Sequence, residues 1–170
     1  MKTRILVALL LASAAARAER SWVFEPDQAL VTVESRGHSA VSHGLSGRFR
    51  ELGGGEMQVE MRILLTSFVP DGARPDLKRH PPEVIFEGVA GKPGKDGVFR
   101  LQGTLTLRGT LRSLEVPVTL VRAGGMAFGH ASFSLHLRDF GFVVPAGIDD
   151  EAKVQIDAGM RPEGVLASRG

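Results

Sequence analysis

The feature that most constrains the fold is a strict alternation of side chains between Val98 and Val121, a stretch that reads VFRLQGTLTLRGTLRSLEVPVTLV. One parity of its first half is apolar or glycine and the other is polar: Phe99, Leu101, Gly103, Leu105 and Leu107 alternate with Arg100, Gln102, Thr104, Thr106 and Arg108. Such alternation is typical of a strand with one buried and one solvated face. Gly109–Ser113 interrupts it, and it resumes with Leu114, Val116, Val118 and Leu120. Two such runs joined by a short glycine-containing loop predict an antiparallel β-hairpin.

Pro117 has no N–H to donate, so we expect the second strand of this hairpin to lie near an edge or a bulge at that point. The rest of the chain reads as further strands, expected at Trp22–Phe24, Ala29–Ser35, Leu45–Arg50, Glu56–Leu65, Val84–Val89, Ala127–Leu137 and Lys153–Ala158. Residue types predict a turn at Glu25–Asp27 and an irregular stretch at Arg36–Gly44. Four prolines break regular structure across Ser67–Pro82, where Asp76–His80 has room for one helical turn.

About eight strands, little helix and connections too short for βαβ crossovers predict an all-β, antiparallel fold. Because each strand has one apolar face, the sheet is expected to curl around that face. The economical closed form is a β-barrel whose interior is either packed or holds one ligand. A sandwich of two sheets is the competing architecture.

The first 18 residues have the organisation of a secretory signal peptide, with Lys2 and Arg4 before the apolar run Ile5–Ala16 and an A-x-A cleavage site that ends at Ala18. A short membrane anchor is the competing interpretation. We therefore expect a periplasmic or secreted protein with a barrel domain over residues 19–160 and a disordered tail over 161–170. The chain has no cysteine, which excludes disulfides, thiolate metal sites, a cysteine nucleophile and a lipoprotein anchor.

The basic character of the chain comes largely from this N-terminal segment. The pI of the whole sequence is about 9.4. Removal of Lys2, Arg4 and Arg17 leaves 18 basic against 19 acidic side chains, a net charge of −1. No basic block remains along the sequence to attract nucleic acid or anionic lipid head groups, so neither is an expected partner.

The chain carries no recognisable catalytic or metal-binding constellation. Its histidines, at positions 38, 43, 80, 130 and 136, lack metal-ligand spacing. Ser134, His136 and Asp139 have the residue types of a catalytic triad but no nucleophile elbow or oxyanion-hole signature. Asp149–Glu151 lacks the alternating oxygen ligands of a calcium loop, and no lysine or helix follows Gly53–Gly55 as a phosphate loop requires. We therefore expect a protein that is not an enzyme and holds no metal.

The apolar parity of the predicted strands is the remaining candidate site. It contains no charged residue and is rich in methionine and phenylalanine, which suit loosely shaped apolar sites. Two interpretations stay open, a packed core and a cavity for an apolar ligand. In the second, the predicted lining residues are Phe49, Met57, Val59, Met61, Phe86, Leu105, Val118, Phe133 and Leu135.

Several motifs in turn resemble the YceI-like family of secreted, lipocalin-like, polyisoprenoid-binding proteins. The hairpin G-T-L-T-L-R-G of residues 103–109, with V-P-V at 116–118, is the most specific of them. Weaker similarities are W-V-F-E-P-D at 22–27 with V-T-V at 31–33, the spacing of His43, Gly47 and Phe49 before Gly54–Gly55, P-E-V-I-F at 82–86, and Phe133 through Gly141 with Asp150 and Val154–Ile156. The similarity covers nearly all of residues 19–158.

The resemblance implies a lipocalin-like barrel with a long apolar tunnel that holds an isoprenoid or another lipid chain. We expect no cofactor other than a bound isoprenoid lipid or quinone. Because the apolar run Ile5–Ala16 is too short to span a bilayer, we expect no integral membrane segment after signal cleavage, and a homodimer stays open. One departure concerns Ser67–Pro82, which is shorter than the helical segment of family members and keeps only Arg74–Leu77 of its R-D-x-x-L-like core. The alternative function is a structural or interaction protein of the cell envelope with a packed barrel and no ligand.

Overall fold

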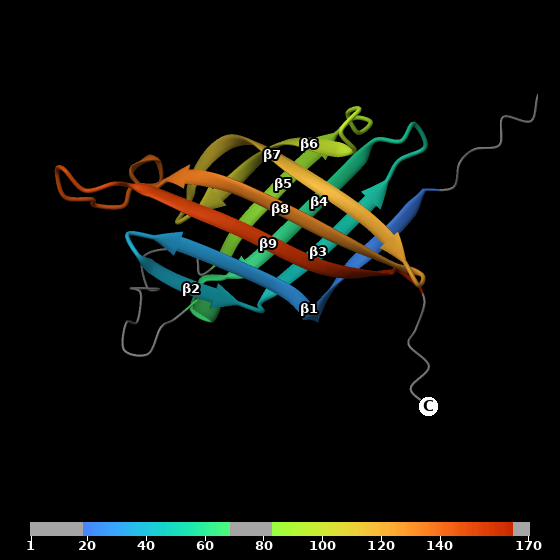
Figure 1. Cartoon of the computed structure of the whole chain (residues 1–170), viewed down its shortest axis with the longest axis horizontal. Helices are drawn as coiled ribbons and strands as arrows, with labels where there is room; N and C mark the ends of the chain where they lie inside the picture. Colours follow the sequence, from blue (N-terminus) through green and yellow to red (C-terminus); the bar gives the residue numbers. More distant parts are fainter. Residues whose placement is uncertain (1–18, 69–82, 165–170) are drawn as a thin grey trace, which may run out of the picture.

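The computed structural model describes residues 19–68 and 83–164 (Figure 1). Nine strands and two short 3₁₀ helices make up the regular structure of this part of the chain: β1 (Arg20–Ser35), β2 (His38–Ser42), β3 (Leu45–Glu51), β4 (Met57–Leu64), η1 (Leu65–Phe68), β5 (Glu83–Ala90), β6 (Val98–Leu107), β7 (Thr110–Ala123), β8 (Met126–His136), η2 (Leu137–Phe140) and β9 (Glu151–Pro162). The predicted signal peptide, the Asp76–His80 turn, Arg74–Leu77 and residues 165–170 of the predicted tail lie outside the described residues.

The strands form one antiparallel sheet that closes on itself. From β3 to β9 each strand pairs with the next in sequence, β3 pairs with β1, and β1 pairs with β9. Eight strands thus form a closed barrel, to which β2 adds as an extra strand on β1. The predicted all-β antiparallel barrel is confirmed, and the competing sandwich is wrong.

The central hairpin has a tighter turn than its sequence suggested. β6 and β7 pair from Val98↔Thr119 through Leu107↔Thr110. The turn therefore consists of Arg108 and Gly109 alone, both in the left-handed region with φ of 53° and 78°. This is the backbone of a two-residue type I′ turn, whose twist matches that of the flanking strands. Most of the predicted Gly109–Ser113 interruption therefore belongs to β7.

Two other predicted breaks are also wrong. Arg36 and Gly37, with φ of 53° and 74°, form the same kind of turn, and His38–Ser42 pairs with β1 as β2. Glu25–Asp27 is not a turn but lies inside β1, where pairing with β9 slips between Phe24 and Ala29. A proline that cannot donate to the ladder is accommodated at such a bulge. β9 also runs past the predicted strand end at Ala158 to Pro162.

The barrel is tightly paired at one end and splayed at the other. β1 pairs with β3 only over Arg20–Val23, and β7 pairs with β8 only over Val118–Ala123. Pro117 is thus the last residue of β7 before pairing with β8 begins, which agrees with its expected position at a local edge. We call the splayed end, where β1, β4 and β8 finish, the mouth, and the opposite end the far end. The mouth lies at the left of Figure 1.

The gap between β1 and β3 at the mouth is occupied by β2 and η1. The Ser42 and Ser67 hydroxyls hydrogen-bond to each other, and Ser42 Oγ also accepts the N–H of Gly44 at 2.9 Å. The side chain of Ser67 in turn donates to the carbonyl of Leu64. These bonds connect the added strand to the end of β4, so the wall of the barrel continues around the mouth although β1 and β3 have separated.

Candidate functional site

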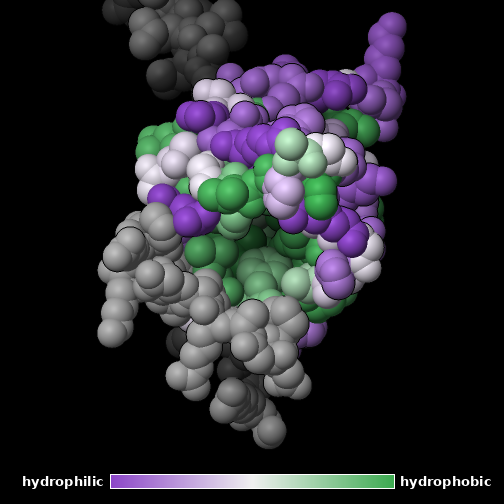
Figure 2. All heavy atoms as spheres, turned by 90° about the vertical axis from the view of Figure 1, so that its left-hand side faces the viewer, coloured by the Kyte–Doolittle hydropathy of each residue, from purple (hydrophilic) through white to green (hydrophobic). Residues whose placement is uncertain are grey.

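An apolar cavity of about 270 Å³ lies inside the barrel at the mouth. The described residues that line it are all apolar and come from most strands and both short helices: Val31, Val33, Ala40, Met61, Ile63, Leu65, Phe68, Val84, Phe86, Leu105, Leu107, Val116, Phe133, Leu135, Leu137, Phe142, Ala152, Val154 and Ile156. Figure 2 looks toward this end and shows a hollow in which hydrophobic residues gather, inside a rim that includes hydrophilic ones. The cavity is therefore suited to an apolar ligand rather than to a polar reactant.

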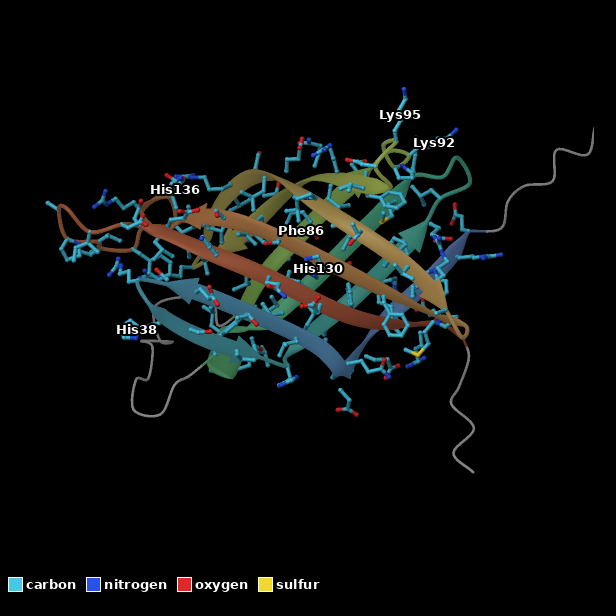
Figure 3. All side chains as sticks on the ribbon, viewed as in Figure 1. His38, Phe86, Lys92, Lys95, His130 and His136 are labelled. Carbon is cyan, nitrogen blue, oxygen red and sulfur yellow. The ribbon has the colours of Figure 1, made fainter. Side chains whose placement is uncertain are left out.

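Two glycines help to make this room by letting an aromatic ring lie against the wall. Gly88 of β5 pairs with Gly103 of β6. A Cβ on Gly88 would lie 2.8 Å from the Phe86 ring, and a Cβ on Gly103 would lie 2.6 Å from it. The ring thus packs onto backbone that carries no side chains, about midway along the barrel in Figure 3. Larger residues at these positions would push the ring toward the lumen.

The interior continues beyond the mouth cavity but narrows sharply. A second apolar cavity of only about 40 Å³ follows and shares Met61 and Ile156 with the first. A third cavity, about 560 Å³, lies at the far end and shares Phe49 and Met57 with the second. Although larger, the third cavity has a mixed lining, in which the charged side chains of Arg20, Glu51, Glu56 and Arg122 accompany apolar ones such as Phe99. An apolar chain there would have to desolvate charged groups, so this cavity suits it less well than the mouth cavity.

The nine predicted lining residues divide between the two apolar cavities. Met61, Phe86, Leu105, Phe133 and Leu135 line the mouth cavity. The others line the small second cavity instead: Phe49, Met57, Val59 and Val118. Alternation identified the inward face correctly but not the position along the barrel axis, because that position depends on the register between strands.

The lining residues that sequence analysis missed fall into two groups. Val31, Ile63 and Leu107 have the apolar parity of their strands, so a signal for them was present. Ala40, Phe68 and Phe142 come from segments that read as irregular or as loops, and only the fold brings them to the mouth. There the guanidinium of Arg108 lies 4.5 Å from the ring centroid of Phe142, a cation–π contact on the rim of the cavity.

His130 and His136 lie on the outer surface of the barrel. His130 Nδ1 lies 2.7 Å from Asp157 Oδ1, and Gln155 Nε2 donates to Asp157 Oδ2 at 2.8 Å. The Gln155 and His130 hydrogen bonds lower the pKa of Asp157 and outweigh the opposing effect of burial. Figure 3 shows His38 and His136 near the mouth and Lys92 and Lys95 at the other end, on the β5–β6 loop.

The residues that suggested a triad or a calcium loop have other partners. His136 Nδ1 lies 3.3 Å from Asp150 Oδ1 rather than pairing with Asp139. Burial would raise the pKa of Asp150, but hydrogen bonds from His136 and from the Arg138 backbone lower it overall. Asp149 accepts the N–H of Glu151 through its side chain and the Nε–H of Arg36 through its carbonyl. These contacts hold the turn before β9.

Comparison with known proteins gives a family and a fold. A family model described as the YceI-like domain matches residues 22–160. The crystal structure of Burkholderia cenocepacia BcnA is similar with a TM-score of 0.67 at 16% identity, over 80% of this chain and 98% of that chain. A polyisoprenoid binding domain from Saccharophagus degradans, implicated in plant cell wall breakdown, has a TM-score of 0.59 at 11% identity, over 82% and 97%. No curated protein matches the chain.

Among the described residues, no helix is both long enough and apolar enough to cross a membrane.

Proposed function

The chain belongs to the YceI-like family, and from this premise we propose that it is a non-catalytic lipid-binding protein that holds an isoprenoid-like or other apolar chain in its barrel. The observation that carries the proposal is the mouth cavity, about 270 Å³ of space whose lining, among the residues that the structure describes, is entirely apolar. Apolar cavities of comparable size can take up apolar molecules. The description of a neighbour of the same fold as a polyisoprenoid binding domain supports the ligand class.

The alternative function, a structural envelope protein, requires a closely packed barrel, and only part of the interior is closely packed. The second cavity, about 40 Å³, is near the size of a single water molecule, and its walls include fully buried side chains such as Phe49. A packed barrel would have the same character throughout. The mouth half differs because β1 and β3, and also β7 and β8, have separated there. We therefore favour binding over a purely structural role.

Our proposal includes a periplasmic or secreted location. Its support is the signal-peptide pattern of the first 18 residues, with two basic residues, a short apolar run and small residues at the cleavage site. A lipid carrier outside the cytoplasm would shield an apolar chain from water between membranes, which is a task that needs a cavity and no catalytic group.

The experiment is organic extraction of the protein purified after export, followed by mass spectrometry. We expect a lipid at a ratio approaching one per protein molecule. Stripped protein should then melt at a higher temperature when an isoprenoid alcohol or a quinone is added, because a ligand that binds only the folded state stabilises it. Val154→Phe narrows the cavity and should reduce both signals, whereas the outward Val89→Phe, at a residue 56% exposed, should not.

An extract without lipid, together with no change in melting temperature on addition of any apolar chain, would contradict the proposal and favour the packed-barrel alternative.

A further inference from the structure

We infer that the mouth cavity buries only about eleven carbon atoms of an apolar chain, the length of two isoprene units or of a decanoyl to dodecanoyl chain, and that Met61 and Ile156 set this limit. The inference rests on the proposed lipid-binding function and adds to it the class of ligand. It is carried by the way the interior is partitioned along the barrel axis.

The first partition lies at the floor of the mouth cavity. Met61 of β4 and Ile156 of β9 line both the mouth cavity and the second cavity, so their side chains separate the two. The strands that carry them are not neighbours in the sheet, so the two side chains enter the lumen from different parts of the wall. Beyond them only about 40 Å³ is free, enough for one or two carbon atoms.

The second partition closes the path to the far end. Phe49 and Met57 separate the second cavity from the third, and each has only 2% of its surface exposed. Behind them are charged side chains, among which Arg122 and Glu51 form an ion pair. A longer apolar tail would have to displace two well-packed side chains and would then meet a charged site that disfavours it. The far end is therefore no exit for the chain.

The volume of the mouth cavity gives the length. A cavity of about 150 Å³ accommodates benzene, which corresponds to roughly 25 Å³ for each carbon atom. On this scale the 270 Å³ at the mouth holds about eleven carbons. A polyisoprenoid of many units would leave most of its length outside this cavity, so that length would gain no affinity from burial in it.

The test is affinity against chain length, measured by calorimetric titration of the stripped, exported protein with straight-chain fatty acids below micelle-forming concentrations. Each methylene that enters the cavity should tighten binding about fourfold. We expect affinity to rise at this rate up to about eleven carbons and then to level off. Prenyl alcohols of two, three and four isoprene units should show the same break after the shortest.

Two substitutions should move the break in opposite directions. Met61→Ala removes three side-chain atoms from the partition and joins the two apolar cavities. The vacated space and the second cavity together hold about four to five carbons, so the break should shift to longer chains by roughly one isoprene unit. Val154→Phe places a ring in the mouth cavity and should shift the break to shorter chains. It adds apolar atoms to empty space, so it keeps the test informative where Met61→Ala fails to fold. Val89→Phe, on the outer surface, is the matched control and should leave the break unchanged.

The outcomes separate the length limit from the proposed function. Affinity that keeps rising about fourfold per methylene to the longest chain overturns the limit and leaves lipid binding intact. A break that stays in place in folded Met61→Ala or in Val154→Phe also overturns it, since the partition would then lie elsewhere. Absence of binding for every chain overturns the proposed function and the length limit together.

Discussion

Phe133 distinguishes a side chain that lines a cavity from one that fills a core. It lies on β8, partly buried, in the wall of the mouth cavity. Truncation of a fully packed phenylalanine to alanine costs about 3–5 kcal/mol. A side chain beside empty space has partner atoms on fewer sides, so we expect Phe133→Ala to cost only about 1–2 kcal/mol in the stripped protein. Chemical denaturation of stripped protein measures this loss.

In lipid-loaded protein the same substitution should lower the melting temperature further, because the ligand loses a contact surface. The control is Phe128→Ala on the same strand, whose ring points outward and is 41% exposed. It should change the free energy of unfolding by less than about 1 kcal/mol and leave lipid stabilisation as in wild type. A core-sized loss in stripped Phe133→Ala would instead indicate a packed barrel.

Asp157 connects β8 and β9 on the outer surface and should make stability depend on pH in a defined direction. Hydrogen bonds from Gln155 and His130 lower its pKa, so its carboxylate form is favoured in the folded protein. The stabilisation is present at pH values above the ordinary aspartate pKa of about 4. It is lost as the pH falls through the lowered pKa of the folded protein.

Asp157→Asn should therefore destabilise the protein at neutral pH by less than about 1 kcal/mol, since the pair is half exposed, and the loss should be smaller at a pH of about 3, below the ordinary pKa of a carboxyl group. Urea midpoints at the two pH values measure the difference. An equal loss at both would show that packing, rather than charge, is what Asp157 contributes. Lipid affinity should be unaffected, because the side chain is outside the barrel.

At the scale of elements, β3 passes so close to β4 that only glycine fits at one position. Gly47 has a φ of +132°, and a Cβ there would lie 2.0 Å from the carbonyl oxygen of Glu60. Gly47→Ala should destabilise the protein by at least about 2 kcal/mol, through backbone strain and forced separation of the strands. Gly91→Ala is the control, because a Cβ at Gly91 meets nothing within 4 Å.

Thermal melts of the two variants are the measurement, and similar melting temperatures would contradict the close approach of β3 to β4. The nearby His43 has a related role, since its Nδ1 lies 3.0 Å from the Ala29 carbonyl oxygen and ties the β2–β3 connection to β1. The spacing of His43, Gly47 and Phe49 noted in the sequence thus corresponds to an anchor, a close contact and a core residue.

A strand could be predicted where its side-chain pattern determines it, and not where backbone pairing with a neighbouring strand does. Strands such as β4 and β6 were predictable because alternation of apolar side chains reports a buried face directly. β2 was not, because His38–Ser42 is short and polar and becomes a strand through its backbone bonds to β1. The 25–27 segment looked like a turn by residue type, yet β9 pairs on both sides of it and holds it in β1 as a bulge.

At the scale of the whole molecule, the sequence predicts which side chains face the interior but not where along the barrel axis the cavity lies. Parity identified Met61 and Phe133 as inward, and both line the mouth cavity. Parity also identified Phe49 as inward, but its side chain lies in the partition near the far end and not in the mouth cavity. The separation of β1 from β3 and of β7 from β8 is what divides the interior, and it depends on where pairing between strands stops, which the alternation within one strand does not encode.

The last prediction concerns the processing of the chain, which must leave the barrel intact. β1 begins at Arg20, whose backbone pairs with Glu51, so cleavage after Ala18 would leave a single residue ahead of the first strand. We expect N-terminal sequencing of the exported protein to begin at Glu19-Arg20-Ser21. Replacement of both small residues of the cleavage site, Ala16→Arg with Ala18→Arg, should leave a longer precursor, whereas Arg17→Lys between them should be processed normally. Folded protein recovered from the cytoplasm with Met1 retained would show that the segment is not a signal peptide, and it would remove the basis for a location outside the cytoplasm.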